Sequence, residues 1–205
     1  MKVLMINGSP RENSNTLLAL KEMATVFETE GIDTEILNIG KLDIKGCQAC
    51  NYCSKRGRCV IDDIVNEAAK KFEESDGLVV GSPVYFASAN ATLVAFLTRL
   101  FYSTSFDKRM KVGASVVIAR RGGCSSTFDE LNKFFNGSGM PLASSNYWNS
   151  VHGLIQGEAA ADEEGIVTVK DLAHNMAFLI KSIALGKEKL GMPISEPPAF
   201  TNYIR

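Results

Sequence analysis

Long apolar runs are missing from this sequence, and so is any excess of charge of one sign. No run among its 205 residues approaches the roughly 18 apolar residues of a membrane-spanning helix. Met1-Lys2 leads directly into a short apolar segment without the pattern of a cleavable signal, so we expect a cytoplasmic protein. The 22 Lys and Arg residues nearly cancel the 23 Asp and Glu residues, which argues against nucleic acid or a membrane as partner. Small molecules or other proteins remain as partners.

Two common nucleotide-binding motifs are missing as well. The sequence contains no G-x-G-x-x-G, the fingerprint of dinucleotide-binding folds, and no G-x-x-x-x-G-K-[ST], the Walker loop. A nucleotide that binds here must therefore use another phosphate-binding loop.

Apolar segments and amphipathic stretches alternate along the chain, whose 45% hydrophobic and 22% charged residues are ordinary for a folded protein. Short apolar runs predict strands at 3–6, 34–39, 77–82 and 113–119, with a weaker fifth at about 140–150. Helical spacing predicts helices at about 15–30, 62–75, 89–102, 126–136 and 168–190, before a Pro-rich tail. Such alternation favours parallel pairing through right-handed crossovers. We therefore expect a single domain over residues 1–205, a three-layer α/β/α sandwich around a five-stranded parallel sheet.

The loop at 7–16, called the phosphate loop below, follows the first predicted strand and is rich in hydrogen-bond donors. Ligands of parallel sheets bind beyond the carboxyl ends of the strands, and free N–H groups at the start of the next helix suit an anion. The side-chain donors are Ser9, Arg11, Ser14, Asn15 and Thr16. A polar turn with Ser14 or Asn15 as helix N-cap would explain the same residues without a ligand. Because both nucleotide motifs are missing, the loop predicts a site for a single phosphate, as FMN carries.

Two further loops follow predicted strands at the same edge of the sheet. The first is Pro83-Val84-Tyr85-Phe86, where proline fixes the backbone and the two aromatic rings offer flat apolar surface for an isoalloxazine ring. Packing of Phe86 under the loop is an equally good interpretation. In the second, Gly122 and Gly123 allow the backbone to approach a ligand and donate N–H groups to it. The arginines just before these glycines are more typical of a solvated surface.

Four of the five cysteines are concentrated in one loop at 46–60, which in a reducing compartment indicates metal or redox chemistry. They are Cys47, Cys50, Cys53 and Cys59. The first two spacings equal those of ferredoxin cluster loops, and nearby Lys and Arg residues would offset the charge of a cluster. A four-cysteine zinc site is an alternative, although zinc loops usually consist of two well-separated C-x-x-C pairs. Free thiols or a redox disulfide are the third interpretation.

Taken together, these motifs resemble those of one family. Gly8-Ser-Pro-Arg-x-x-Ser-Asn-Thr16 is similar to the FMN phosphate loop of the NADPH-dependent FMN reductase and iron-sulfur flavoprotein group. Further similarities are Cys47-x-x-Cys-x-x-Cys53, the segment 81–86 and the segment 149–165. The resemblance implies a flavodoxin-like fold with strand order 2-1-3-4-5, non-covalent FMN lined by residues 83–86, and a homodimer or homotetramer. It also implies that the four cysteines hold a [4Fe-4S] cluster that passes electrons to FMN.

The loop around His152 is the remaining segment with unusual residues. The resemblance would place it at a subunit interface close to the flavin, and Trp148 would suit an anchor there. Burial within its own subunit is the more frequent fate of a single Trp. His174, on the last predicted helix, is most simply a surface or capping residue. We assign a catalytic role to neither histidine.

These patterns lead to one functional hypothesis with two rivals. The chain is expected to be an FMN-dependent oxidoreductase that passes electrons from NAD(P)H or a ferredoxin to flavin and on to an acceptor, directly or through a [4Fe-4S] cluster. The flavin supplies the chemistry, so no catalytic side chain is expected. The rivals are a quinone or nitro-compound reductase without a cluster and a non-enzymatic flavin or metal redox sensor.

Overall fold

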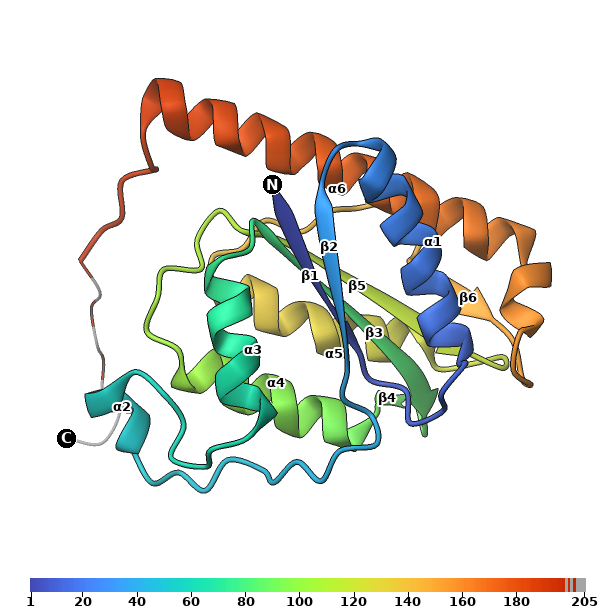
Figure 1. The fold of residues 1–205 in the computed structure, drawn as a ribbon, viewed down its shortest axis with the longest axis horizontal. Helices are drawn as coiled ribbons and strands as arrows, with labels where there is room; N and C mark the ends of the chain where they lie inside the picture. Colours follow the sequence, from blue (N-terminus) through green and yellow to red (C-terminus); the bar gives the residue numbers. More distant parts are fainter. Residues whose placement is uncertain (198, 200, 202–205) are drawn as a thin grey trace.

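A parallel sheet flanked by helices on both faces forms the centre of the molecule (Figure 1). The computed structural model describes residues 1–197, 199 and 201, so part of the predicted Pro-rich tail lies outside the described residues. The main strands are β1 (Lys2–Asn7), β2 (Asp33–Asn38), β3 (Gly77–Tyr85), β5 (Val112–Ala119) and β6 (Ser150–His152). They pair in the order β2-β1-β3-β5-β6, which confirms the predicted order 2-1-3-4-5 for the five parallel strands.

The helices form two layers, and each layer packs on its own apolar core. α1 (Asn15–Thr29) and α6 (Glu163–Leu190) cover one face of the sheet. The opposite face is covered by α3 (Ile64–Glu73), α4 (Ala91–Ser103) and α5 (Cys124–Asn136). Within the described residues, no helix is both long enough and apolar enough to cross a membrane.

The strand sequences explain the burial on both faces. Val3 and Met5 of β1 lie in the core under α1 and α6, while Leu4 and Ile6 lie in the other core. Successive strand side chains point to opposite faces, so a strand covered on both faces needs the continuous apolar run seen here.

Three helix starts agree with the capping residues in the sequence. Ser14, Asp63 and Asp162 each accept a hydrogen bond from a backbone N–H in the first turn of the helix that follows. The cap at Asp162 explains why α6 begins at Glu163, five residues before the predicted start.

The fifth strand is shorter than predicted. Only Ser150–His152 pairs continuously with β5, and within the predicted range before it Leu142 makes a single bridge to Gly113. Pro141 and the polar residues at 144–146 interrupt the apolar pattern, which explains the irregular backbone. Three short elements were not predicted from the sequence. They are the strand β4 (Ser88–Ala89), which pairs antiparallel with the end of β3, the helix α2 (Tyr52–Arg56) and the short helix η1 (Glu158–Ala161).

Candidate functional site

A pocket of about 190 Å³, called the phosphate-loop pocket below, lies at the carboxyl edge of β1, β3 and β5. Eight of the eleven residues predicted to hold a cofactor line it: Ser9, Arg11, Ser14, Asn15, Thr16, Pro83, Val84 and Tyr85. The other lining residues are Ile118, Ala119, Arg120, Gly153 and Leu154, none of them predicted. A pocket at this edge, between loops of neighbouring parallel strands, is where an open α/β sheet binds its ligands.

The phosphate loop is folded by its own hydrogen bonds. The Gly8 N–H donates to the Gly81 carbonyl at 2.9 Å, which ties the loop to β3. The Ser9 hydroxyl accepts from the Arg11 N–H at 3.3 Å, and the Ser14 hydroxyl accepts from the Leu17 N–H at 3.0 Å. Ser14 is therefore the N-cap of α1, as the polar-turn interpretation required. Each of these hydroxyls still carries a proton that it can donate to an anion in the pocket.

Asn15 lines the pocket and also makes hydrogen bonds that the sequence did not predict. Its Oδ1 accepts from the N–H groups of Gly157 at 2.9 Å and Ala159 at 3.4 Å, and its Nδ2 donates to the Ile155 carbonyl at 2.9 Å. The buried amide thus fastens the segment 153–159 beside the phosphate loop. These contacts use one of the two N–H groups of Nδ2, and a direct bond from Asn15 to a phosphate stays a prediction.

The segment 153–159 is also held by a carboxylate. Glu158 Oε2 accepts from the N–H groups of Leu154 at 2.6 Å and Ile155 at 2.9 Å. The Ile155 and Leu154 N–H groups favour the ionised carboxylate and hold the pKa of Glu158 below its ordinary 4.5. The charge of Glu158 therefore helps to shape the pocket wall that Gly153 and Leu154 form.

We expect this wall to loosen in acid. Because the pKa of Glu158 is lower in the folded chain, its stabilising effect is complete above pH 4.5 and is lost as the pH falls through the folded-state pKa. Amide protection factors of Leu154 and Ile155, measured by hydrogen exchange and NMR, should fall over that range. Glu158→Gln should give the low protection at every pH, whereas the exposed Glu164→Gln should behave as wild type. Equal protection in all three proteins would contradict this role.

The predicted ring wall is only partly present in this pocket. Tyr85 lines it and is about half exposed, but Phe86 is fully exposed and does not pack under its loop. Phe86 and Ala87 both have positive φ, 51° and 58°, because they form the tight turn between β3 and β4. Gly122 and Gly123 also lie outside the pocket lining. Gly123, at φ 91°, is the N-cap of α5.

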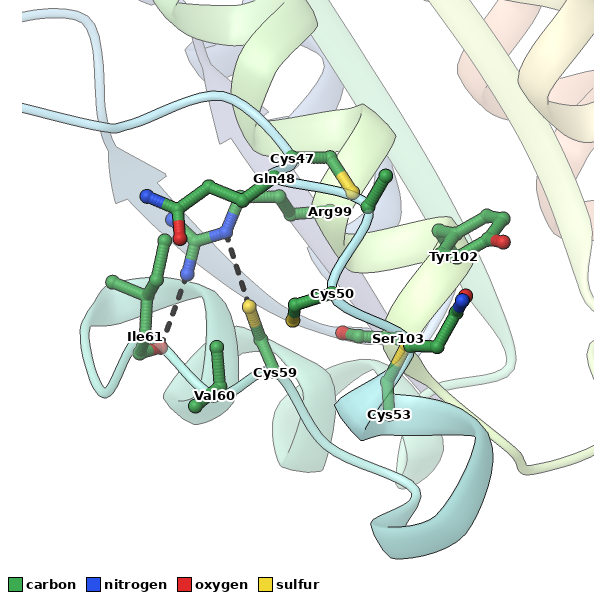
Figure 2. A pocket seen from close by; sticks show the side chains of 12 residues that line it. Cys47, Gln48, Cys50, Cys53, Cys59, Val60, Ile61, Arg99, Tyr102 and Ser103 are labelled. Atoms are coloured by element: carbon green, nitrogen blue, oxygen red, sulfur yellow. Dashed lines mark hydrogen bonds between the residues drawn. The ribbon is translucent and has the colours of Figure 1, made fainter.

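The four loop cysteines line a second cavity, called the cysteine cavity below (Figure 2). Cys47 and Cys50 are exposed, Cys53 and Cys59 are partly buried, and none forms a disulfide. The opposite wall comes from α4 through Arg99, Tyr102 and Ser103. Among the described residues, no three His, Cys, Asp or Glu side chains are close enough together to hold a single metal ion.

A buried arginine attaches the cysteine loop to α4. The Arg99 side chain is 1% exposed and makes two hydrogen bonds to Asp63, of 2.7 and 2.9 Å. It also donates to the carbonyls of Ile61 and Lys45, and its Nε donates to Cys59 Sγ at 3.3 Å. Burial alone would lower the pKa of the Arg99 guanidinium, but its bonds to Asp63 and Cys59 outweigh burial and raise it. The arginine therefore places a fixed positive charge beside a cysteine sulfur.

The aromatic residues near His152 are exposed, although Val151 beside it belongs to the buried core. Trp148 is exposed and packs edge to face against Tyr147, with ring centroids 4.6 Å apart, so burial within the subunit is wrong for this tryptophan. His152 Nε2 lies 4.0 Å from Cys124 Sγ, and burial raises the pKa of the Cys124 thiol. His174 pairs with Glu30 at 2.9 Å on the surface, as expected.

Comparisons with known proteins agree with this architecture. A sequence model of the family described as NADPH-dependent FMN reductase matches residues 1–154. An iron-sulfur flavoprotein of Methanocaldococcus jannaschii is 34% identical over 191 residues, which cover 89% of this chain and 99% of that protein. A structure of RosB with bound 8-demethyl-8-formylriboflavin-5'-phosphate has a TM-score of 0.70 at 16% identity, covering 100% of this chain and 94% of that chain. For a flavodoxin from the Archaea, the TM-score is 0.61 at 14% identity, covering 88% and 99%. At these identities the two structures bear on the fold alone, and they confirm that it is flavodoxin-like.

Proposed function

This chain belongs to the NADPH-dependent FMN reductase and iron-sulfur flavoprotein family, and we propose that it passes electrons from NAD(P)H or a ferredoxin to FMN and on to an acceptor through a [4Fe-4S] cluster. Membership makes it a flavoprotein oxidoreductase. The finer proposal depends on one observation: a single chain contains both a pocket beside a phosphate loop and a cavity lined by four cysteines.

The phosphate-loop pocket has the donors that an FMN phosphate needs. We propose that Ser9, Ser14 and Thr16 donate to the phosphate together with the N–H groups at the start of α1, while Arg11 offsets its charge. Bound FMN would supply a ring that accepts a hydride or single electrons. Residues 83–85 would line one side of that ring. Roles for Phe86, Gly122 and Gly123 at the ring stay proposals, since they lie outside the pocket of this chain.

The cysteine cavity fits a cluster better than a single ion. Each cysteine ligand of a [4Fe-4S] cluster binds a different iron, so the four thiolates surround a cavity instead of converging on one point. Cys47, Cys50, Cys53 and Cys59 all border one cavity, and no carboxylate is among its described lining residues. Arg99 supplies positive charge beside the negative group that the thiolates would hold.

We also propose that the single domain at 1–205 works as a homodimer or homotetramer. α4 begins beside the end of β3, next to the phosphate-loop pocket, and its last residue, Ser103, lines the cysteine cavity. A helix of 13 residues is roughly 20 Å long, so the two sites of one chain are separated by about that length. A neighbouring subunit that brought its cysteine cavity to this phosphate-loop pocket would shorten the path for the electron. The exposed pair of Tyr147 and Trp148 would suit the contact. Light scattering on the purified protein tests this, and a monomer would contradict it.

Replacing Thr16 by valine should weaken FMN binding. Thr16 is buried at the start of α1 and lines the pocket, and a hydrogen bond to a charged group contributes about 1.5–3 kcal/mol. That loss corresponds to a rise in the FMN dissociation constant of about 10- to 100-fold. The assay is quenching of flavin fluorescence during titration. Thr25→Val, on the exposed side of α1, is the matched control and should bind as wild type. Absence of any flavin band in the reconstituted wild-type protein would overturn the proposed function.

One set of assays identifies the electron donor and distinguishes the proposed function from its two rivals. Protein purified anaerobically is tested for flavin reduction by NADPH, by NADH and by reduced ferredoxin, with iron and acid-labile sulfide measured on the same sample. Turnover of quinones with NADPH in a sample without iron would favour the quinone reductase. Flavin binding without reduction by any of the three donors would favour the sensor.

A further inference from the structure

Ser103, the last residue of α4, carries an unused hydroxyl. Its Oγ is the only buried side-chain nitrogen or oxygen atom in the described part of the chain that has no hydrogen-bond partner. A buried hydroxyl without a partner costs free energy, because it gives up its bonds to water and receives nothing in return. Such an atom in a folded protein indicates a partner that the protein alone does not supply.

The position of Ser103 identifies where that partner would lie. Ser103 lines the cysteine cavity, and Figure 2 shows its hydroxyl between the side chains of Cys50 and Cys53. Ser103 and Arg99 are four residues apart on α4, so they lie one turn apart on the same face of the helix. Arg99 Nε already donates to Cys59 Sγ at 3.3 Å. The helix therefore directs two donors toward the same group of sulfurs.

We propose that the Ser103 hydroxyl donates a hydrogen bond to a sulfur of the cluster held by the four cysteines, and that Ser103 thereby raises its reduction potential. This inference rests on the cluster assigned under the proposed function. Ser103 is a positioning and tuning residue rather than a ligand, because it keeps its proton and binds no iron.

The direction of the effect follows from charge. When the cluster gains one electron from a reduced donor, the donor loses one, and the added negative charge spreads over the sulfur atoms without a proton being transferred. A hydrogen bond to sulfur is then stronger in the reduced state than in the oxidised state, so it favours reduction. Arg99 acts in the same direction through its N–H and its charge. Loss of the Ser103 donor should therefore make the cluster harder to reduce.

The test compares Ser103→Ala with Thr104→Val in the full-length protein after anaerobic cluster assembly. Thr104 is the matched control because its hydroxyl is adjacent in sequence but donates to the Leu100 carbonyl at 2.7 Å. Potentiometric titration followed by EPR should give a lower cluster potential in Ser103→Ala and an unchanged one in Thr104→Val. Ser103→Thr, which keeps the hydroxyl, should restore the wild-type potential. In D₂O, the reduced wild-type cluster should couple to one more exchangeable deuteron than the alanine variant, which keeps the deuteron on Arg99 Nε.

A second measurement separates this role from a structural one. Without a cluster, Ser103→Ala removes only an unpaired hydroxyl, so its melting temperature should equal or exceed that of wild type. A lower melting temperature in the cluster-free protein would identify a structural residue and overturn the inference.

The remaining outcomes are also decisive. Equal potentials and equal deuteron signals in wild type and Ser103→Ala, with full iron and sulfide content, would overturn the role of Ser103 while leaving the cluster in place. That result would point to an ordered water as the partner. Absence of iron and sulfide from the wild type would overturn the cluster and the role of Ser103 together, and flavin absorbance would report separately on FMN binding. If Ser103→Ala does not assemble a cluster, the wild-type deuteron spectrum decides: a coupled deuteron beyond that of Arg99 Nε supports the role of Ser103, and its absence overturns that role.

Discussion

Gly40→Ala is expected to weaken FMN binding by at least about a hundredfold while the sheet remains folded. A Cβ at this position would lie 2.3 Å from the carbonyl carbon of Ser9, 2.4 Å from its oxygen and 2.5 Å from the Gly8 oxygen. All three are backbone atoms of the phosphate loop, so no side-chain rotation can make room and the loop itself must move. Loss of two hydrogen bonds to a charged phosphate costs about 3 kcal/mol or more, which is the stated hundredfold.

The matched control for this substitution is Gly186→Ala in α6. A Cβ at Gly186 would meet nothing within 4 Å, and alanine is favoured over glycine inside a helix by up to about 1 kcal/mol. That variant should bind FMN as wild type does and be slightly more stable. The measurements are fluorescence titration with FMN and circular dichroism of both variants. A wild-type dissociation constant for Gly40→Ala would show that the phosphate loop is not the site of binding.

The fold could be predicted from the sequence because each main strand carries its own signal. β1 and β5 are short apolar runs followed by Gly or polar residues, and only a strand covered on both faces needs that pattern. The last strand carries a weaker signal. Its three residues pair with β5 only because the chain returns there after an irregular stretch, and such long-range pairing leaves no local pattern.

The candidate site could be predicted only where it depends on local chemistry. The phosphate loop and the cysteine spacing are local, and the structure gathers each of them around a cavity. Phe86 could not be placed, because a turn with positive φ directs it into solvent. The importance of Gly40 depends on the approach of two loops that are about thirty positions apart in the sequence.

Arg99 is the clearest residue that sequence reasoning missed. It lies in α4 among leucines and phenylalanines at a position whose burial is evident from the helical pattern. A charged residue there needs a buried partner, and that signal was available. The identity of the partner was not, since Asp63 had a sufficient local explanation as the cap of α3.

Asp63→Asn is expected to lower the free energy of unfolding by about 3 kcal/mol, because it leaves the Arg99 charge buried without a carboxylate. Breaking a buried ion pair from one side usually costs about 3–5 kcal/mol. The lower end applies because the Asp63 side chain is 23% exposed and water can replace part of its effect. Asparagine has the same shape as aspartate and remains a good N-cap for α3. The loss of unfolding free energy therefore reports the contribution of the Asp63 charge and not that of the cap.

Asp62→Asn provides the comparison, since this neighbouring carboxylate is 76% exposed and lies 3.7 Å from Arg58. Denaturant unfolding should place that variant within about 0.5 kcal/mol of wild type, as exposed ion pairs contribute little. A similar loss in both variants would mean that the Asp63 effect is not due to the buried pair.

The double variant with Arg99→Met separates the pair from its surroundings. Methionine leaves no buried charge, so adding Asp63→Asn to Arg99→Met should cost less than Asp63→Asn alone, with a coupling energy of about 1–3 kcal/mol. The carbonyls of Ile61 and Lys45 lose their donor in both methionine proteins, so the cycle cancels that contribution. Because Arg99 also contacts Cys59, faster hydrogen exchange in the cysteine loop of Asp63→Asn would show that the ion pair positions the thiols as well as stabilising the fold.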